Sequence, residues 1–384
     1  MKRLGGVWVR VTAFDNLYQA YLRARRGKRD RPAVRDFEFA LEAELLQLQA
    51  ELSDGGYRPG GYRLFQIYDR KPRLIAAAPF RDRVAHHAVM GVIEPTLDRR
   101  FIHDSYACRV GKGVHAAVRR YQQWARTHAY VLKLDVSRYF PSIDHGLLKA
   151  KLRRRIKDVG VLNLLDRMID SAPSGFAPPV AGPSDDLVDL MQRGRGLPIG
   201  NLTSQFFGNL YLNDLDHYLK QACGVRAYLR YVDDLVLLHD DKNQLWRWRD
   251  AIAEFLLTER LMLHPRKTQV QPVGLGLNLL GYRVWPWRVR LQRDSGYRYR
   301  KRLRGLARGY ALGRVDLEDV RASVAAWLGH VNHAESLGLR RAVLGSVSFR
   351  RGCAGTRPAR GSRRWLEQPT GEPACGEPQQ EHHR

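Results

Sequence analysis

The chain has 384 residues and a formal net charge of +26 at pH 7, from 65 Lys and Arg against 39 Asp and Glu. This excess exceeds what solubility requires and predicts a polyanionic partner such as a nucleic acid. No apolar stretch of about 18 residues and no signal-peptide pattern occurs, which argues against a membrane protein. No Cys-x-x-Cys pair occurs either, which argues against a zinc knuckle and a disulfide framework. A cytoplasmic location is therefore expected.

The N-terminal part predicts helices followed by a hairpin. Residues 14–27 and 34–53 have helical character, and the second segment carries apolar residues at helical spacing and ends at Gly55-Gly56. Residues 61–78 alternate like a β-hairpin, and a helix is expected over about 80–97.

A carboxylate interrupts the apolar run that follows, Tyr130 to Phe140. Asp135 lies there among Val131, Leu132, Leu134 and Val136, which predict a strand. Such an acid is either a functional group or a strand-terminal cap for the next helix.

Residues 171–196, rich in Pro, Gly and Ser, predict a long loop.

Two adjacent carboxylates, Asp233 and Asp234, lie inside a second apolar run, Ala227 to Leu238, which predicts a buried strand or tight hairpin. Two like charges about 4 Å apart repel by roughly 4 kcal/mol at an effective dielectric of 20. A divalent metal is the usual compensation. Asp-Asp pairs also mark solvated turns, an interpretation that suits Asp240-Asp241. If the two runs form neighbouring strands, Asp135 and Asp233 can bind the same cations.

The C-terminal part predicts helices and a tail. A strand-like segment, Val284 to Leu291, precedes residues 297–345, which predict three helices broken near Gly313 and Gly329. Beyond about Phe349 the low apolar content predicts disorder.

Five motifs occur here in the order found in reverse transcriptases. They are Asp135 followed by Phe140, Gly196-Leu197-Pro198-Ile199-Gly200-Asn201, Ser204-Gln205, Tyr231-Val232-Asp233-Asp234, and Leu279-Leu280-Gly281-Tyr282. The chain resembles the reverse transcriptases of diversity-generating retroelements, a group II intron-like prokaryotic family. Ile199 and Gln205, where most reverse transcriptases carry Gln and Pro, are typical of that group.

The resemblance implies an α+β right-hand polymerase of fingers, palm and thumb, with an antiparallel palm sheet and a helical thumb. The expected organisation is an N-terminal helical extension (1–60), fingers and the start of the palm (61–129), a palm (130–290) with a fingers segment inserted near 145–196, a thumb (291–348) and a disordered tail (349–384).

The resemblance also assigns a metal site and a proton donor. Asp135, Asp233 and Asp234, with Val136 beside them, would bind two Mg²⁺ ions, because carboxylate oxygens suit that ion. Lys267 would protonate the pyrophosphate leaving group.

Other side chains would bind nucleotide and nucleic acid. The nucleotide-binding residues expected are Lys71, Arg73, Phe140, Ile199, Gly200 and Gln205. The Phe140 ring would exclude a 2′-hydroxyl, although an ordinary core Phe is the alternative. A turn at Leu280, Gly281 and Tyr282 resembles the primer grip. Phosphates of the nucleic acid would be bound by Arg298, Arg300, Lys301, Arg302 and Arg304.

These features predict a polymerase that uses deoxyribonucleoside triphosphates and a template-repeat RNA, forms an RNA/cDNA duplex, and makes cDNA with adenine-biased errors. Ile199 lacks the hydrogen bonds of Gln, so base-pair checking should be looser, unless Ile199 is a packing residue. The family implies a small basic accessory protein oligomer as a further partner. The alternatives are an ordinary-fidelity group II intron-like or defence-associated reverse transcriptase, and an RNA-binding protein without activity. The residues after the thumb show no His/Cys nuclease pattern.

Overall fold

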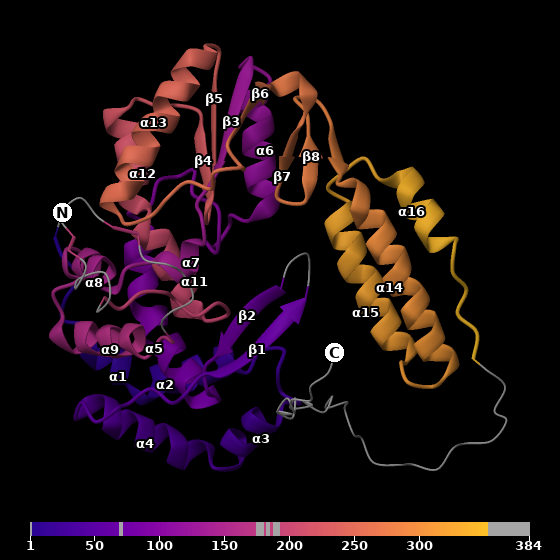
Figure 1. Cartoon of the computed structure of the whole chain (residues 1–384). Helices are drawn as coiled ribbons and strands as arrows, with labels where there is room; N and C mark the ends of the chain where they lie inside the picture. Colours follow the sequence, from indigo (N-terminus) through magenta and orange to yellow (C-terminus); the bar gives the residue numbers. More distant parts are fainter. Residues whose placement is uncertain (1, 69–71, 174–179, 182–184, 187–192, 352–384) are drawn as a thin grey trace, which may run out of the picture. The chain divides into compact units, whose positions relative to one another are not determined.

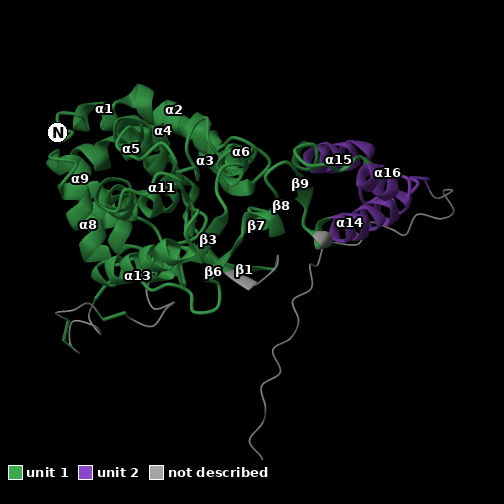
Figure 2. Ribbon diagram, turned by 90° about the horizontal axis from the view of Figure 1, so that it is seen from above, with its two compact units in different colours: residues 1–295, 329–337 green, residues 296–328, 338–384 purple. Residues whose placement is uncertain are grey.

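The computed structural model describes residues 2–68, 72–173, 180–181, 185–186 and 193–351 (Figure 1). The chain divides into two compact units (Figure 2). Unit 1 comprises Met1–Ser295 with Gly329–Leu337, and unit 2 comprises Gly296–Leu328 with Gly338–Arg384. The described residues contain helices and antiparallel sheets, and none of their helices is both long and apolar enough to cross a membrane.

Five helices and a hairpin form the N-terminal part of unit 1. They are α1 (Trp8–Thr12), α2 (Phe14–Ala24), α3 (Pro32–Phe39), α4 (Leu41–Ser53), β1 (Arg63–Tyr68), β2 (Pro72–Ala77) and α5 (Phe80–Asp98). The predicted hairpin and the helix after it are confirmed. The predicted single helix 34–53 is wrong, because the backbone leaves the helical conformation at Ala40. The break lets α3 bury Val34 and Phe37 while α4 buries its own apolar face.

The largest sheet of the described chain has four antiparallel strands in the order β4-β5-β3-β6. Its strands are β3 (Tyr130–Asp135), β4 (Tyr228–Tyr231), β5 (Asp234–His239) and β6 (Gln269–Pro272). Alternate side chains enter two apolar clusters: Leu132 and Leu235 belong to one cluster, and Val131 and Val236 to the other. Both faces of the sheet are therefore covered, with α13 (Lys242–Thr258) contacting β3 and β5 and α6 (Val114–Ala125) contacting β4.

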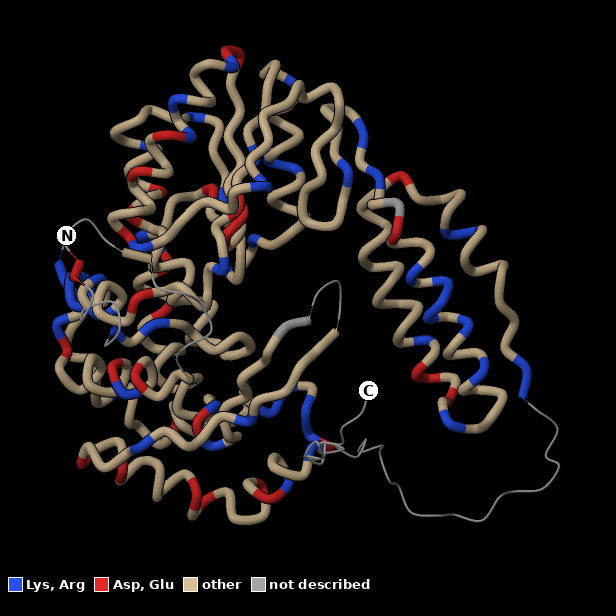
Figure 3. The backbone as a smooth tube through the Cα atoms, viewed as in Figure 1, with Lys and Arg blue, Asp and Glu red and all other residues tan. Residues whose placement is uncertain are grey.

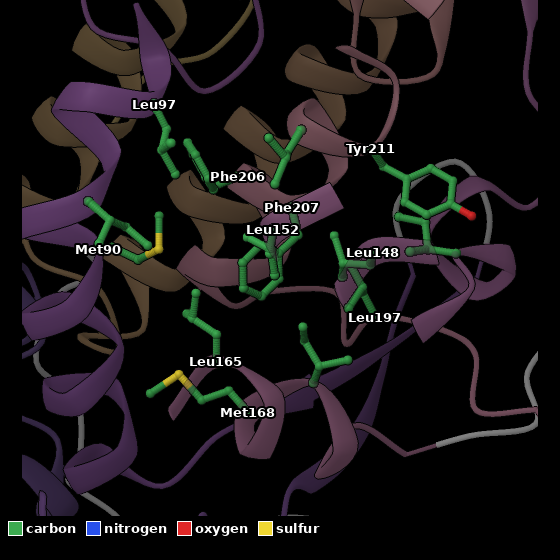
Figure 4. Packing of buried hydrophobic residues seen from close by; sticks show 14 of the residues in the cluster. Met90, Leu97, Leu148, Leu152, Leu165, Met168, Leu197, Phe206, Phe207 and Tyr211 are labelled. Atoms are coloured by element: carbon green, nitrogen blue, oxygen red, sulfur yellow. The ribbon is translucent and has the colours of Figure 1, made fainter. Parts of the chain in front are cut away.

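Short helices connect the strands and extend the first cluster. They are α7 (Tyr139–Ser142), α8 (His145–Arg153), α9 (Val159–Asp170), α11 (Leu202–Tyr211), α12 (Asn213–His217) and a π-helical turn (Tyr218–Ala222). Their apolar side chains pack with those of α5 (Figure 4). Examples are Met90, Leu97, Leu148, Leu152, Leu165, Met168, Phe206 and Phe207. The predicted loop 171–196 is only partly described, and its described residues form no helix or named strand.

A sheet of three short strands follows a 3-10 turn (Val273–Leu275). Its strands are β7 (Leu277–Leu279), β8 (Tyr282–Val284) and β9 (Val289–Leu291), in the order β7-β8-β9. The predicted continuous strand Val284 to Leu291 is wrong. The backbone turns at Trp285–Arg288, where the Trp285 N–H donates to the Arg288 carbonyl, and β9 folds back onto β8.

The last helices are α14 (Arg293–Ala311), α15 (Leu317–Val331) and α16 (Leu337–Leu344). In unit 2, α14 and α15 pack through the Tyr299 and Trp327 rings, which stack 4.3 Å apart. The three helices predicted for residues 297–345 are confirmed, with one break near Gly313 and the second after Val331, two residues beyond Gly329. Ser336 Oγ donates to the Val331 carbonyl there and satisfies one acceptor at the helix end. Most of the predicted tail, residues 352–384, lies outside the described residues.

Candidate active site

Three carboxylates meet at one end of the four-stranded sheet. Asp135 is the last residue of β3 and Asp234 the first residue of β5, and the two are direct partners in the antiparallel register. Asp233 precedes Asp234 in the turn, and its carbonyl accepts from the Val136 N–H at 3.2 Å. The register therefore brings Asp135 close to Asp233 and Asp234, which follow it by 98 and 99 positions in the sequence.

The two adjacent acids lie on a tight hairpin. Tyr231 pairs with Asp234, so Val232 and Asp233 form a two-residue turn. Val232 has φ of +58°, in the left-handed region that a β-branched residue rarely occupies. Such strain occurs often at functional sites and persists only where surrounding contacts fix it.

Two lysines neutralise part of the negative charge. Lys267 Nζ lies 2.7 Å from both Asp135 carboxylate oxygens, and Lys133 Nζ lies 3.1 Å from Asp234 Oδ1. Burial raises the pKa of Asp233 from its ordinary 3.8 to about 6, with the Asp234 and Asp135 charges adding to that effect. A further cation would stabilise the ionised form of this cluster.

The donor set fits magnesium. Carboxylate oxygens are hard ligands of the kind that Mg²⁺ prefers, and the Val136 side chain is buried, so only its backbone could contribute. Among the residues that the structure describes, no group of three or more His, Cys, Asp or Glu is already arranged around one metal position. Lys267 and Lys133 occupy oxygens that an ion would need.

The expected nucleotide-binding residues lie on three segments. Phe140, in α7, is partly buried, and a Cβ on Gly208 would lie 3.1 Å from its ring. The carbonyl of Ile199 accepts from the Ala76 N–H of β2 at 3.3 Å. Lys71 lies outside the described residues, and only the backbone of Arg73, in β2, is described.

Gly200 and Gln205 line a cavity of about 370 Å³ between β1, β2, α5 and the start of α11. Lys28 and Arg83 also line it, and burial together with Arg83 lowers the pKa of Lys28. Two cations held close together in a partly closed space favour an anionic ligand such as a phosphate.

The turn expected to be a primer grip joins β7 to β8. Leu280 and Gly281 have φ of +48° and +93°, so both residues of this two-residue turn lie in the left-handed region. The buried Tyr282 hydroxyl lies 3.0 Å from His115 Nε2 and 2.9 Å from His330 Nδ1. Sequence reasoning singled out neither histidine as a contact of this turn.

The basic residues expected to bind nucleic acid lie along α14 in unit 2, where Figure 3 shows a concentration of Lys and Arg. Tyr299 and Leu303 face the interior of that unit. Arg298, Lys301, Arg302 and Arg304 are exposed and Arg300 is partly exposed, so α14 presents a cationic surface.

Two cations near the acids were missed from the sequence. Lys133 lies two residues before Asp135, so the period of a strand places both on one face. Arg230 is a charged residue inside the apolar run Ala227 to Leu238, which signals a buried partner.

Comparison with known proteins gives a consistent picture. Residues 68–284 match the family described as Reverse transcriptase (RNA-dependent DNA polymerase). Protein YkfC of Escherichia coli K12 is 29% identical over 285 residues, covering 64% of this chain and 72% of YkfC. The group II intron-encoded protein LtrA of Lactococcus lactis is 23% identical over 212 residues, covering 54% of this chain and 33% of LtrA. Nuclear intron maturase 1 of Arabidopsis thaliana is 29% identical over 87 residues, 23% of this chain and 12% of that protein.

Proposed function

The chain belongs to the reverse transcriptase (RNA-dependent DNA polymerase) family, and we propose that it extends a DNA primer on an RNA template at Asp135, Asp233 and Asp234. The observation that carries this proposal is the register of β3 and β5, which pairs Asp135 with Asp234 directly beside Asp233. Three carboxylates on adjacent strands form the donor set that two-metal nucleotidyl transfer requires.

The three acids would hold two Mg²⁺ ions, which when bound supply charge neutralisation and activation of the primer 3′-hydroxyl. Lys267 already lies at this site, on Asp135. Its ammonium group is a suitable proton donor for the pyrophosphate that leaves. Lys133 would hold Asp234 in place from the same strand face as Asp135.

We assign the four-stranded sheet with its helices to the palm, the β1–β2 hairpin to the fingers, and α14 to α16 to the thumb. The cavity beside Gly200 and Gln205 then receives phosphates of a nucleotide or template strand, because Lys28 and Arg83 line it. The exposed cations of α14 contact the phosphates of the RNA/cDNA duplex. We propose the domain boundaries expected from the sequence as the limits of these three parts.

The finer proposal is error-prone synthesis of the diversity-generating type. Ile199 is partly exposed, and it is absent from the apolar clusters formed by the described residues, which favours a role other than packing. An apolar side chain there offers no hydrogen bond to a base pair. Near-identical DNA repeats beside the gene, differing mainly at adenines, would support this subclass.

The direct test is Mg²⁺-dependent primer extension on an RNA template by the purified protein. Wild type should extend the primer, and Asp135→Asn should not, since the substitution removes a ligand without changing shape. Asp250→Asn, in the exposed face of α13, is the matched control and should retain activity. An Asp135→Asn variant with substantial activity would refute the assignment, and RNA binding by an inactive wild type would favour an RNA-binding protein.

A further inference from the structure

Arg230 in β4 is fully buried, and each of its five guanidinium N–H groups points at an acceptor. Nε and Nη2 donate to the two carboxylate oxygens of Asp216 at 2.8 and 2.6 Å. Nη1 and Nη2 donate to the side-chain and backbone oxygens of Asn209 at 3.3 and 3.1 Å. The remaining N–H, on Nη1, donates to the Val232 carbonyl at 3.2 Å.

The partners of Arg230 are themselves fixed. Asp216, in α12, is fully buried and also accepts from the Tyr228 hydroxyl at 2.7 Å. Asn209, in α11, is buried and donates to the Ala107 carbonyl at 2.7 Å. The backbone of Arg230 donates to the Asp104 carbonyl at 3.0 Å. The guanidinium therefore connects two helices to the turn that carries Asp233.

The turn depends on such support. Val232 holds a left-handed conformation, and its carbonyl accepts from Arg230 on one side of the turn. On the other side the Asp233 carbonyl accepts from the N–H of Val136, the residue after Asp135. These two hydrogen bonds fix the turn between the Arg230 network and the strand that presents the first acid.

A buried ion pair is a weak stabiliser, because its Coulomb attraction is offset by the desolvation of both charges. A contribution to folding stability therefore does not explain why Arg230 directs all five N–H groups at acceptors, one of them in a strained turn. We propose that Arg230 is a positioning residue, which holds the Val232 carbonyl and thereby orients Asp233 for divalent-metal binding. This inference rests on the proposed polymerase function.

The test compares Arg230→Lys with wild type by Mn²⁺ binding, followed by electron paramagnetic resonance, and by primer extension. Lysine keeps the charge beside Asp216 but cannot direct five donors, so the hydrogen bond to Val232 is lost. We expect Mn²⁺ affinity and kcat each to fall by about 10- to 100-fold, which is typical for loss of a group that orients a metal ligand. The KM for nucleotide and the affinity for RNA should stay within a few fold.

The matched control is Lys151→Met. Lys151 is a second buried cation, 2.7 Å from Asp214 and 2.7 Å from Glu259, and it has no hydrogen bond to the 232–233 turn. This variant should lower the thermal midpoint but retain the Mn²⁺ affinity of wild type. Equal Mn²⁺ affinity of Arg230→Lys and wild type, or an equal loss in Lys151→Met, would overturn the positioning role.

A further variant covers the case in which Arg230→Lys does not fold. Arg230→Met combined with Asp216→Leu removes both buried charges and keeps apolar packing, so it should fold yet show the same loss of Mn²⁺ affinity. Wild-type Mn²⁺ affinity in this variant would also overturn the role. A wild type that binds Mn²⁺ but extends no primer would refute the proposed polymerase function, and the positioning role would still be decided by the Mn²⁺ affinities.

Discussion

The ammonium group of Lys267 lies 2.7 Å from each carboxylate oxygen of Asp135. It thus occupies the oxygens that a metal ion would take, and it is also the proton donor that we propose for the leaving pyrophosphate. These two roles predict opposite effects of removing the charge, one on metal binding and one on rate.

We predict that Lys267→Met binds Mn²⁺ more tightly than wild type but extends primers on the order of 100-fold more slowly at saturating Mg²⁺. The first effect follows because a competing cation is removed, and the second because a general acid is lost. Mn²⁺ titration and single-nucleotide addition rates measure the two effects separately. An unchanged rate would remove Lys267 from the chemistry.

Asp233→Asn should abolish DNA synthesis while leaving RNA affinity within a few fold. The amide matches the carboxylate in shape but is a poor metal ligand, whereas RNA binding is spread over many basic residues. Primer extension and a filter-binding titration on the same RNA check the prediction. A comparable loss of RNA affinity would instead indicate that the fold is disturbed.

The same variant should change the pH dependence of stability in the presence of EDTA. The pKa of Asp233 is raised in the native state to about 6. Between about pH 4 and pH 6 the native carboxyl is therefore protonated while the unfolded one is ionised, so the free energy of unfolding falls as pH rises through that window. Asn carries no charge, so Asp233→Asn should exceed wild type in unfolding free energy at pH 7 by up to about 3 kcal/mol. Urea unfolding at pH 4 and pH 7 measures this difference, which should shrink at the lower pH.

The sequence predicted the convergence of the three carboxylates better than the local backbone around them. Asp135, Asp233 and Asp234 stood out because each carboxylate interrupts an apolar run, and pairing of two such runs is what joins them. The bend at Trp285–Arg288 does carry a local signal, because Pro286 lies within it and favours a turn. The helix break at Ala40 has no comparable signal, because tertiary packing selects it. The network around Arg230 involves Asn209 and Asp216, and no local pattern reveals contacts between separate helices and a strand.

Phe140→Ala should raise the incorporation of ribonucleotides relative to deoxyribonucleotides. The ring is only partly buried in α7, so a face of it remains available to exclude a 2′-hydroxyl. The ratio of kcat/KM for matched ribo- and deoxyribonucleoside triphosphates is the measurement. An unchanged ratio in an active variant would return Phe140 to a packing role beside Gly208.

Replacing Arg302 and Arg304 together by Gln should weaken binding of an RNA/DNA duplex and make it less salt-dependent. Both side chains are exposed on α14, and each lost phosphate contact lowers the slope of log K against log salt by about 1. Arg247→Gln, on the exposed face of α13, is the control and should leave the slope unchanged. Equal slopes for all three proteins would exclude α14 from duplex binding.

Ile199→Gln tests the proposed low fidelity. Ile199 follows Pro198 and is held to β2 through its own carbonyl, so a change of side chain should leave that backbone contact in place. If an apolar side chain weakens alignment of template and nucleotide, Gln should restore part of the discrimination, mostly opposite adenine. One recovered hydrogen bond corresponds to about 1 kcal/mol, or roughly fivefold in error rate.

The measurement is misincorporation per template base on one RNA at equal nucleotide concentrations, with wild type and variant side by side. Wild-type errors that are low and even across the four bases would favour an ordinary-fidelity enzyme, whereas high adenine-biased errors that Gln does not reduce would retain the subclass and exclude Ile199 as the cause.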